Sequence, residues 1–198
     1  MNVLVINGNS KNTSTTKAII DELKSVFERD GISIVTENIG GNNIRGCISC
    51  DHCRNVGKCV FGDAVNEIAP KLEEADGIVV ISSTYYTSSN PTVLAFIDRI
   101  LFSTNFEKKM KVGASIAVSK YGSCSPSVEE VNKYFTSYGM PVISSTFGRT
   151  IHDSTELDET SLQSVRSLAE NMSFLLRCIE LGKLSYGFDV SPYERTQR

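Results

Sequence analysis

Four cysteines lie close together in one stretch of the sequence, from Cys47 to Cys59. Their spacing is C-x2-C-x2-C-x5-C, which allows a compact loop to wrap around a single bound group. A cubane iron–sulfur cluster takes four thiolates supplied at short range, whereas structural zinc usually takes two cysteine pairs that are far apart in the sequence. The spacing therefore favours an iron–sulfur cluster over zinc, and a loop of reduced thiols or a redox disulfide is the other interpretation.

A run of hydroxyl side chains follows the first apolar segment of the chain and precedes an expected helix. Backbone N–H groups at a helix N-terminus attract a phosphate, hydroxyls add donors, and a lysine adds a counter-charge. Helix capping is the alternative interpretation, although one hydroxyl would suffice for it. The stretch matches neither G-x-G-x-x-G nor G-x-x-x-x-G-K-[ST], which argues against an NAD-type Rossmann domain and a P-loop NTPase. The candidate phosphate contacts are Asn9, Ser10, Lys11, Ser14, Thr15 and Thr16.

Two later loops carry tyrosines among small polar residues. One spans residues 82–91 and contains Tyr85 and Tyr86, and the other spans residues 119–123. Tyrosine faces, hydroxyls and backbone amides suit the face and the edge of a heteroaromatic ring. The alternative for the tyrosines is packing at the surface or in an interface.

The elements that position these loops alternate between short apolar strands and amphipathic helices. The expected strands cover residues 3–6, 32–35, 77–82, 112–118 and 141–147. The expected helices cover residues 15–29, a stretch capped by Asp63, a stretch that begins at Pro91, residues 127–138 and residues 158–181. This alternation predicts an α/β fold with a doubly wound, five-stranded parallel sheet in the order 2-1-3-4-5 and helices on both faces. We expect one domain over residues 1–198, with the cysteine-rich loop at about 40–61 inserted after the second strand.

Composition and charge indicate which kinds of binding partner this protein has. The chain has 198 residues, a formal net charge of -3 and a pI near 5.5. These values do not suggest a nucleic-acid or membrane surface. The sequence opens without a signal-peptide pattern, and no apolar run approaches the roughly 20 residues of a membrane helix. We therefore expect a cytoplasmic protein with reduced thiols and with neither nucleic acid nor membrane as a partner.

The loops resemble those of the flavodoxin-like NAD(P)H-dependent FMN reductase family. Residues 8–11 stand where that family carries a Gly-Ser-Pro-Arg-type loop, although proline is absent and lysine replaces arginine. The likeness is clearest after the third strand, where the next helix carries Phe96-x-Asp98-Arg99. We expect Asp98 and Arg99 to orient neighbouring groups or to form an interface. The resemblance implies a flavodoxin-like fold that binds FMN through these loops. After the third and fourth strands the implied contacts are Ser83, Thr84, Tyr85, Tyr86, Thr87, Ser88, Ser119, Tyr121 and Gly122.

The cysteine spacing resembles the iron–sulfur flavoprotein branch of that family, which carries a compact cysteine motif after strand two. The resemblance implies one [4Fe-4S] cluster near the FMN. Similar loops also occur in flavodoxin-like reductases with no established cluster, so free thiols, a disulfide or adventitious metal remain alternatives. The implied cluster ligands are Cys47, Cys50, Cys53 and Cys59.

The resemblance implies an FMN-dependent oxidoreductase or electron-transfer flavoprotein. Electrons would come from NAD(P)H or a ferredoxin and pass to a quinone, a flavin or another acceptor. No side chain is expected to be catalytic, because FMN carries the chemistry. A homodimer or homotetramer is expected on the same basis. The alternative is a non-enzymatic metal or redox sensor, in which the cysteine loop acts and the α/β domain is a scaffold.

Overall fold

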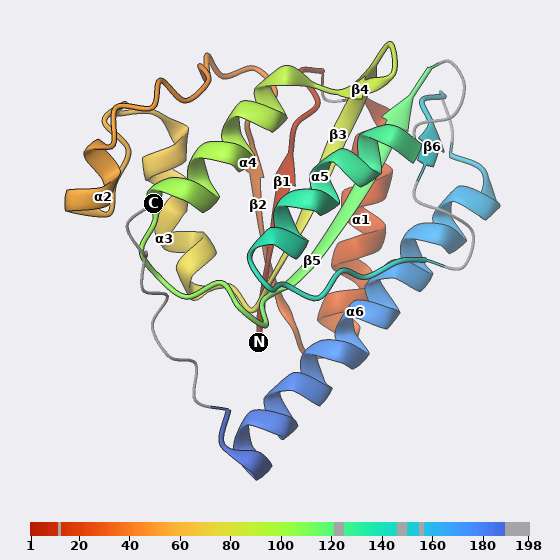
Figure 1. The fold of residues 1–198 in the computed structure, drawn as a ribbon. Helices are drawn as coiled ribbons and strands as arrows, with labels where there is room; N and C mark the ends of the chain where they lie inside the picture. The colour runs from red at the N-terminus through yellow and green to blue at the C-terminus, as the bar shows by residue number, and fades with distance from the viewer. Residues whose placement is uncertain (12, 121–124, 146–149, 155–156, 189–198) are drawn as a thin grey trace.

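A parallel β-sheet forms the centre of the computed structural model, which describes residues 1–11, 13–120, 125–145, 150–154 and 157–188. Its strands are β1 (Asn2–Asn7), β2 (Ser33–Asn38), β3 (Gly77–Tyr85), β5 (Val112–Ser119) and β6 (Thr150–His152). They lie in the order β2-β1-β3-β5-β6 (Figure 1). A two-residue strand, β4 (Ser88–Ser89), pairs antiparallel with β3 outside this path. The order of the parallel strands is therefore the expected 2-1-3-4-5.

Helices cover both faces of the sheet, which confirms the doubly wound architecture (Figure 1). The helices are α1 (Ser14–Arg29), α2 (His52–Val56), α3 (Ala64–Glu74), α4 (Pro91–Ser103), α5 (Ser125–Ser137) and α6 (Glu159–Tyr186). In β1, Val3 and Val5 pack with α1 and α6, whereas Leu4 and Ile6 pack with α3, α4 and α5. Because successive side chains of a strand point to opposite faces, an unbroken apolar strand requires this double cover.

Polar caps set the starts of the helices. The side-chain oxygens of Thr13, Asp63, Asn90 and Asp158 each accept a hydrogen bond from a backbone N–H in the first turn of α1, α3, α4 and α6, respectively. Pro91 occupies the first turn of α4, where its missing N–H costs nothing. The expected cap at Asp63 and the expected helix start at Pro91 are both confirmed.

The last strand lies later in the chain than expected. We expected it at residues 141–147, of which 146 and 147 lie outside the described residues, but continuous pairing with β5 occurs in β6 (Thr150–His152). Val142 makes only an isolated bridge to β5. Two residues further on, the carbonyl of Ser144 accepts a hydrogen bond of 2.9 Å from the Asn171 side chain on α6. Within the described part of this segment, the backbone thus leaves the sheet for the helix, although its apolar composition is typical of a strand.

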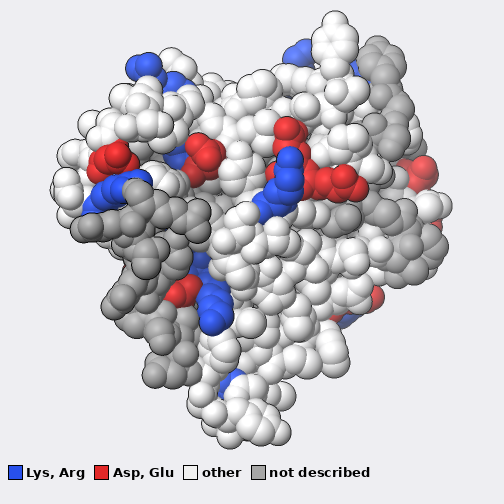
Figure 2. Space-filling model, in the orientation of Figure 1, with Lys and Arg blue, Asp and Glu red and all other residues white. Residues whose placement is uncertain are grey.

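The surface carries charges of both signs. On the face drawn in Figure 2, basic and acidic side chains form small mixed groups separated by uncharged surface. None of the helices in the described ranges combines the length and the apolar character needed to span a membrane.

The close packing of Gly113 in β5 against Phe135 can be tested by substitution. A Cβ at Gly113 would lie 2.6 Å from ring atoms of Phe135, which is fully buried. We expect Gly113→Ala to lower the free energy of unfolding by about 1–3 kcal/mol, the usual cost of overpacking. Urea denaturation followed by circular dichroism measures the change.

Gly182→Ala on α6 is the control, since an added Cβ there meets nothing within 4 Å and alanine favours a helix. This variant should be at least as stable as the wild type. If Gly113→Ala were equally stable, the packing described for β5 would be wrong.

Candidate functional site

A hollow of about 830 Å³ opens at the carboxyl ends of β1, β3 and β5. Parallel strands end at one edge of a doubly wound sheet, and ligands of such folds bind at that edge. The volume lies within the roughly 300–1,000 Å³ typical of small-molecule sites. The hollow is lined by Asn9, Ser10, Lys11, Thr13, Ser83, Thr84, Tyr85, Tyr86, Val118, Ser119, Lys120 and Asp153.

Asn9 joins the first loop to the elements around it. Its backbone N–H donates to Asn7 Oδ1 at 3.0 Å, and its side-chain amide donates to the hydroxyl of Thr16. Its side-chain oxygen accepts a hydrogen bond from the Ser83 hydroxyl of the second loop. Asn9 is thus buried, and its hydrogen bonds fix the first two loops against each other. Ser10, by contrast, is exposed at the hollow.

The hydroxyl residues that follow Asn9 differ in whether they line the hollow. Thr15 and Thr16 are fully buried, and Thr15 Oγ1 donates to the Ser154 carbonyl at 2.7 Å. Neither threonine lines the hollow, nor does Ser14, which is exposed. The capping residue Thr13 lines it instead. Thr13 is not among the expected contacts, although its position before the first apolar turn of the helix is the usual signature of a cap.

The second loop presents the two tyrosines. Four of the residues predicted to contact FMN, Ser83, Thr84, Tyr85 and Tyr86, line the hollow. Tyr86 is fully exposed and has a φ of 55°, a left-handed conformation that is uncommon for a bulky residue.

The returning arm of this loop anchors it to α5. Ser89 pairs with Thr84, and its N–H and hydroxyl bond to Glu130 and to the carbonyl of Ser127. The expected contacts Thr87, in the turn before β4, and Ser88, in β4, do not line the hollow.

The third loop contributes the end of β5. Val118, Ser119 and Lys120 line the hollow, whereas the expected contacts Tyr121 and Gly122 lie outside the described residues. Asp153 follows β6, and its N–H donates to the Ser119 carbonyl at 2.7 Å. The sequence carried no signal for Asp153, because its place at this edge depends on the displaced last strand.

The four clustered cysteines line a second, much smaller hollow. Cys53 is buried and Cys59 is half-buried, whereas Cys47 and Cys50 are exposed. These four and Cys178 are free thiols. Among the described residues, no three Cys, His, Asp or Glu side chains are close enough together to hold a metal as they stand. The fold therefore brings the expected ligands to one place without joining them in a finished site.

Arg99 of α4 lines the same small hollow and is 1% exposed. Its two terminal nitrogens donate to both carboxylate oxygens of Asp63, at 2.7 and 2.9 Å. Burial alone would lower the pKa of this guanidinium, but hydrogen bonds to Asp63 and Cys59 outweigh burial and raise the pKa. Arg99 thus stays charged and holds Asp63 and Cys59 by hydrogen bonds.

The cysteine loop begins against the first loop of the large hollow. The N–H of Ile39 donates to the Asn7 carbonyl at 2.8 Å. A Cβ at Gly40 would fall onto the backbone of Asn9 and Ser10. Only glycine therefore permits this approach, and a displacement of one loop must disturb the other.

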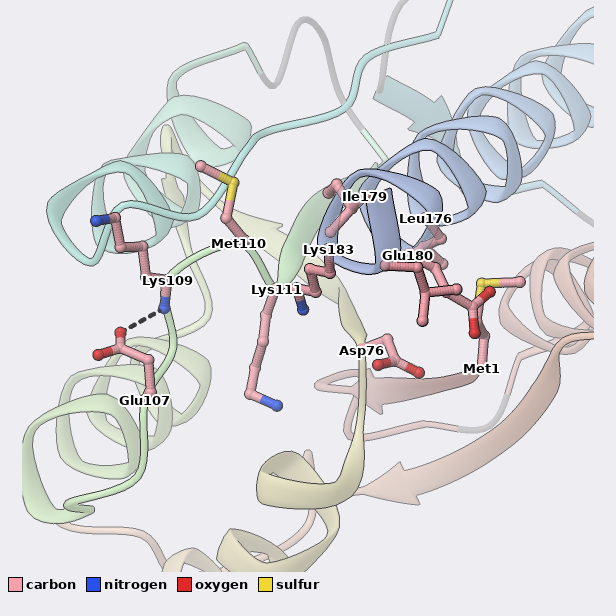
Figure 3. A pocket seen from close by; sticks show the side chains of 11 residues that line it. Met1, Asp76, Glu107, Lys109, Met110, Lys111, Leu176, Ile179, Glu180 and Lys183 are labelled. Carbon is pink, nitrogen blue, oxygen red and sulfur yellow. Dashed lines mark hydrogen bonds between the residues drawn. The ribbon is translucent and has the colours of Figure 1, made fainter. Parts of the chain in front are cut away.

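A further hollow of about 410 Å³ lies at the opposite edge of the sheet (Figure 3). There Glu107 accepts a hydrogen bond of 2.7 Å from the Lys109 backbone, and the Lys111 ammonium donates to the Glu73 and Ala75 carbonyls. Burial lowers the pKa of that ammonium. Helices end at this edge with their carbonyl groups, which disfavours a phosphate. The hollow at the carboxyl ends is therefore the better candidate site.

Comparison with known proteins gives consistent matches. The family model described as NADPH-dependent FMN reductase matches residues 1–152. An iron-sulfur flavoprotein of Methanocaldococcus jannaschii is 24% identical over 192 residues, covering 91% of this chain and 100% of the relative. An iron-sulfur flavoprotein of Methanosarcina thermophila is 28% identical over 186 residues, covering 91% and 97%. A solved flavodoxin from the domain Archaea superposes with a TM-score of 0.61 at 16% identity, over 89% of this chain and 99% of that chain, which supports the fold.

The contact of Gly40 with Asn9 allows a test of whether the large hollow binds FMN. We expect Gly40→Ala to weaken binding of FMN, the ligand that the family resemblance implies, by about tenfold or more, because the added methyl displaces Asn9. A tenfold loss corresponds to about 1.4 kcal/mol, within the usual cost of overpacking. Titration of the flavin-free protein with FMN, followed by quenching of flavin fluorescence, measures the affinity.

Gly41→Ala is a matched control at the next residue, since a Cβ there meets nothing within 4 Å. Equal FMN affinities for the two variants would show that the first loop is not part of the binding site.

Proposed function

Since the chain belongs to the NADPH-dependent FMN reductase family, we propose that it is an FMN-dependent oxidoreductase. It would take electrons from NADPH, NADH or a ferredoxin and pass them to a quinone, a flavin or another acceptor. The observation that carries the proposal is the hollow of about 830 Å³ at the carboxyl ends of β1, β3 and β5.

The chemistry of the lining fits FMN. Ser10, Lys11 and Thr13 surround the N-terminus of α1, where hydroxyls, an ammonium group and the helix dipole suit a phosphate. Tyr85 and Tyr86 offer aromatic faces for a flat ring. FMN bound there would supply hydride and single-electron transfer, whereas the side chains bind and orient it.

We propose further that Cys47, Cys50, Cys53 and Cys59 hold a [4Fe-4S] cluster. Two observations support a fit: the four thiols line one hollow, and the buried Nε of Arg99 has no hydrogen-bond partner within the described ranges. The names of the two archaeal relatives point the same way. Loading would require the exposed turn with Cys47 and Cys50 to move toward Cys53 and Cys59. The cluster would supply one-electron transfer.

Anaerobic purification followed by a visible spectrum and a donor assay tests the oxidoreductase. We expect a coloured protein with about one FMN per chain, and bleaching of the flavin band when NADPH, NADH or a reduced ferredoxin is added. A colourless protein that cannot be reconstituted with FMN would exclude this function. About one zinc per chain in such a protein would favour the cysteine-based sensor.

Cys50→Ser tests the ligand assignment, and the exposed position of this thiol makes the variant compatible with the fold. We expect bound iron to fall from about four per chain to less than half of that, because the cluster loses a thiolate. FMN content should stay unchanged, since Cys50 does not line the large hollow. Iron, acid-labile sulfide and flavin assays on anaerobic protein give the three values.

Cys178→Ser is the control, because this exposed thiol lies on α6 outside the cysteine loop. Its iron content should equal that of the wild type. If Cys50→Ser also kept its full iron and sulfide content, Cys50 would not be a ligand.

A further inference from the structure

A charged side chain is buried beside the cysteine loop. Among the described residues, Arg99 has one of the largest fully buried side chains. An isolated charge at such a depth would be very costly, so its hydrogen-bond partners determine whether the fold tolerates it. Besides Asp63, Arg99 donates from one terminal nitrogen to the Arg45 carbonyl at 3.2 Å and from the other to Cys59 Sγ at 3.1 Å.

The guanidinium is held on a second side by an aromatic ring. Its central carbon lies 4.9 Å from the centroid of Phe61, and the guanidinium of Arg45 lies 4.8 Å from the same centroid. The ring, the carboxylate of Asp63 and the carbonyl of Arg45 together leave Arg99 little freedom. Its contact with the Cys59 sulfur is therefore built into the fold.

The backbone of Cys59 is fixed independently. Its N–H donates to the Asn66 side-chain oxygen at 3.0 Å, and the Asn66 amide donates to the carbonyls of Cys59 and Phe61 at 2.9 and 2.6 Å. Asn66 lies on α3, whose start is capped by Asp63. One end of the cysteine motif is thus preorganised, whereas Cys47 and Cys50 at the other end are exposed.

We propose that Arg99 is a positioning residue of the iron–sulfur site, which holds the Cys59 sulfur and raises the reduction potential of the cluster. The inference rests on the proposed cluster. Reduction adds negative charge to a cluster whose thiolates already make it anionic. An N–H donor and a positive charge in a region shielded from water stabilise that added charge. The carboxylate of Asp63 opposes the effect, because it partly neutralises the guanidinium.

This arrangement predicts shifts of opposite sign for two variants. In Arg99→Gln the cluster loses a hydrogen bond and a cation, so its midpoint potential should fall. We expect the ratio of oxidised to reduced cluster at a fixed potential to rise about tenfold, or about 59 mV for one electron. In Asp63→Asn the charge of Arg99 is no longer neutralised, so the midpoint should rise. Asparagine retains the ability to cap α3.

The measurement is an anaerobic redox titration of the iron-loaded protein, followed by electron paramagnetic resonance of the reduced cluster. Arg54→Gln is the matched control, since Arg54 lies in the same loop, is exposed and pairs with Asp51 at 2.7 Å. This control removes the same charge at a solvated position, where screening weakens its effect. Its midpoint should stay close to that of the wild type.

Arg99→Lys keeps the charge, but a lysine cannot donate hydrogen bonds to Asp63 and Cys59 together. We therefore expect the midpoint potential to fall less than in Arg99→Gln.

A merely structural role for Arg99 would change iron content without shifts of opposite sign. Equal midpoints for Arg99→Gln and Arg54→Gln in iron-loaded protein would overturn the inference and leave the proposed cluster intact. If Arg99→Gln failed to retain iron, Asp63→Asn would decide: a higher midpoint supports the inference, and an unchanged or lower one refutes it. Wild-type protein that takes up no iron would overturn both the cluster and this inference.

Discussion

Parallel pairing of β1 with β3 and of β3 with β5 is the constraint on which the candidate site depends. Ile81 pairs with Asn7 on one side and with Ile116 on the other, so the three strands reach the same edge in register. The N–H of Gly8 continues the ladder by donating to the Ile81 carbonyl at 2.8 Å. The loops that follow must therefore meet, and their polar groups line one hollow although they are distant in the sequence.

Two small contacts connect this hollow with the cysteine loop. Gly40 packs against the backbone of Asn9, and Asn9 in turn accepts a hydrogen bond from Ser83. At the far end of the loop, Arg99 binds Asp63 and Cys59 from α4. The loop is thus held at one end by the first loop of the hollow and at the other end by α4.

Much of the fold could be predicted because it depends on local chemistry. The cap at Asp63 and the start at Pro91 follow from the preferences of single residues for the first turn of a helix. The unbroken apolar strands predicted a sheet covered on both faces. The last strand was predicted too early: residues 141–147 have the composition of a strand, but in their described part only Val142 bridges to β5, and continuous pairing comes at Thr150–His152. The Ser144 carbonyl instead accepts a hydrogen bond from α6, a non-local contact.

The sequence by itself determined the α/β class, the order of the parallel strands and three loops whose residues meet at one edge. It did so because periodicity, caps and short crossovers are local properties of the chain. Only the tertiary structure decided which hydroxyls face the hollow: Thr13 lines it, whereas Thr15 and Thr16 are buried. Only the tertiary structure brought Arg99 to the sulfur of Cys59, because burial and long-range hydrogen bonds depend on elements that are distant in sequence.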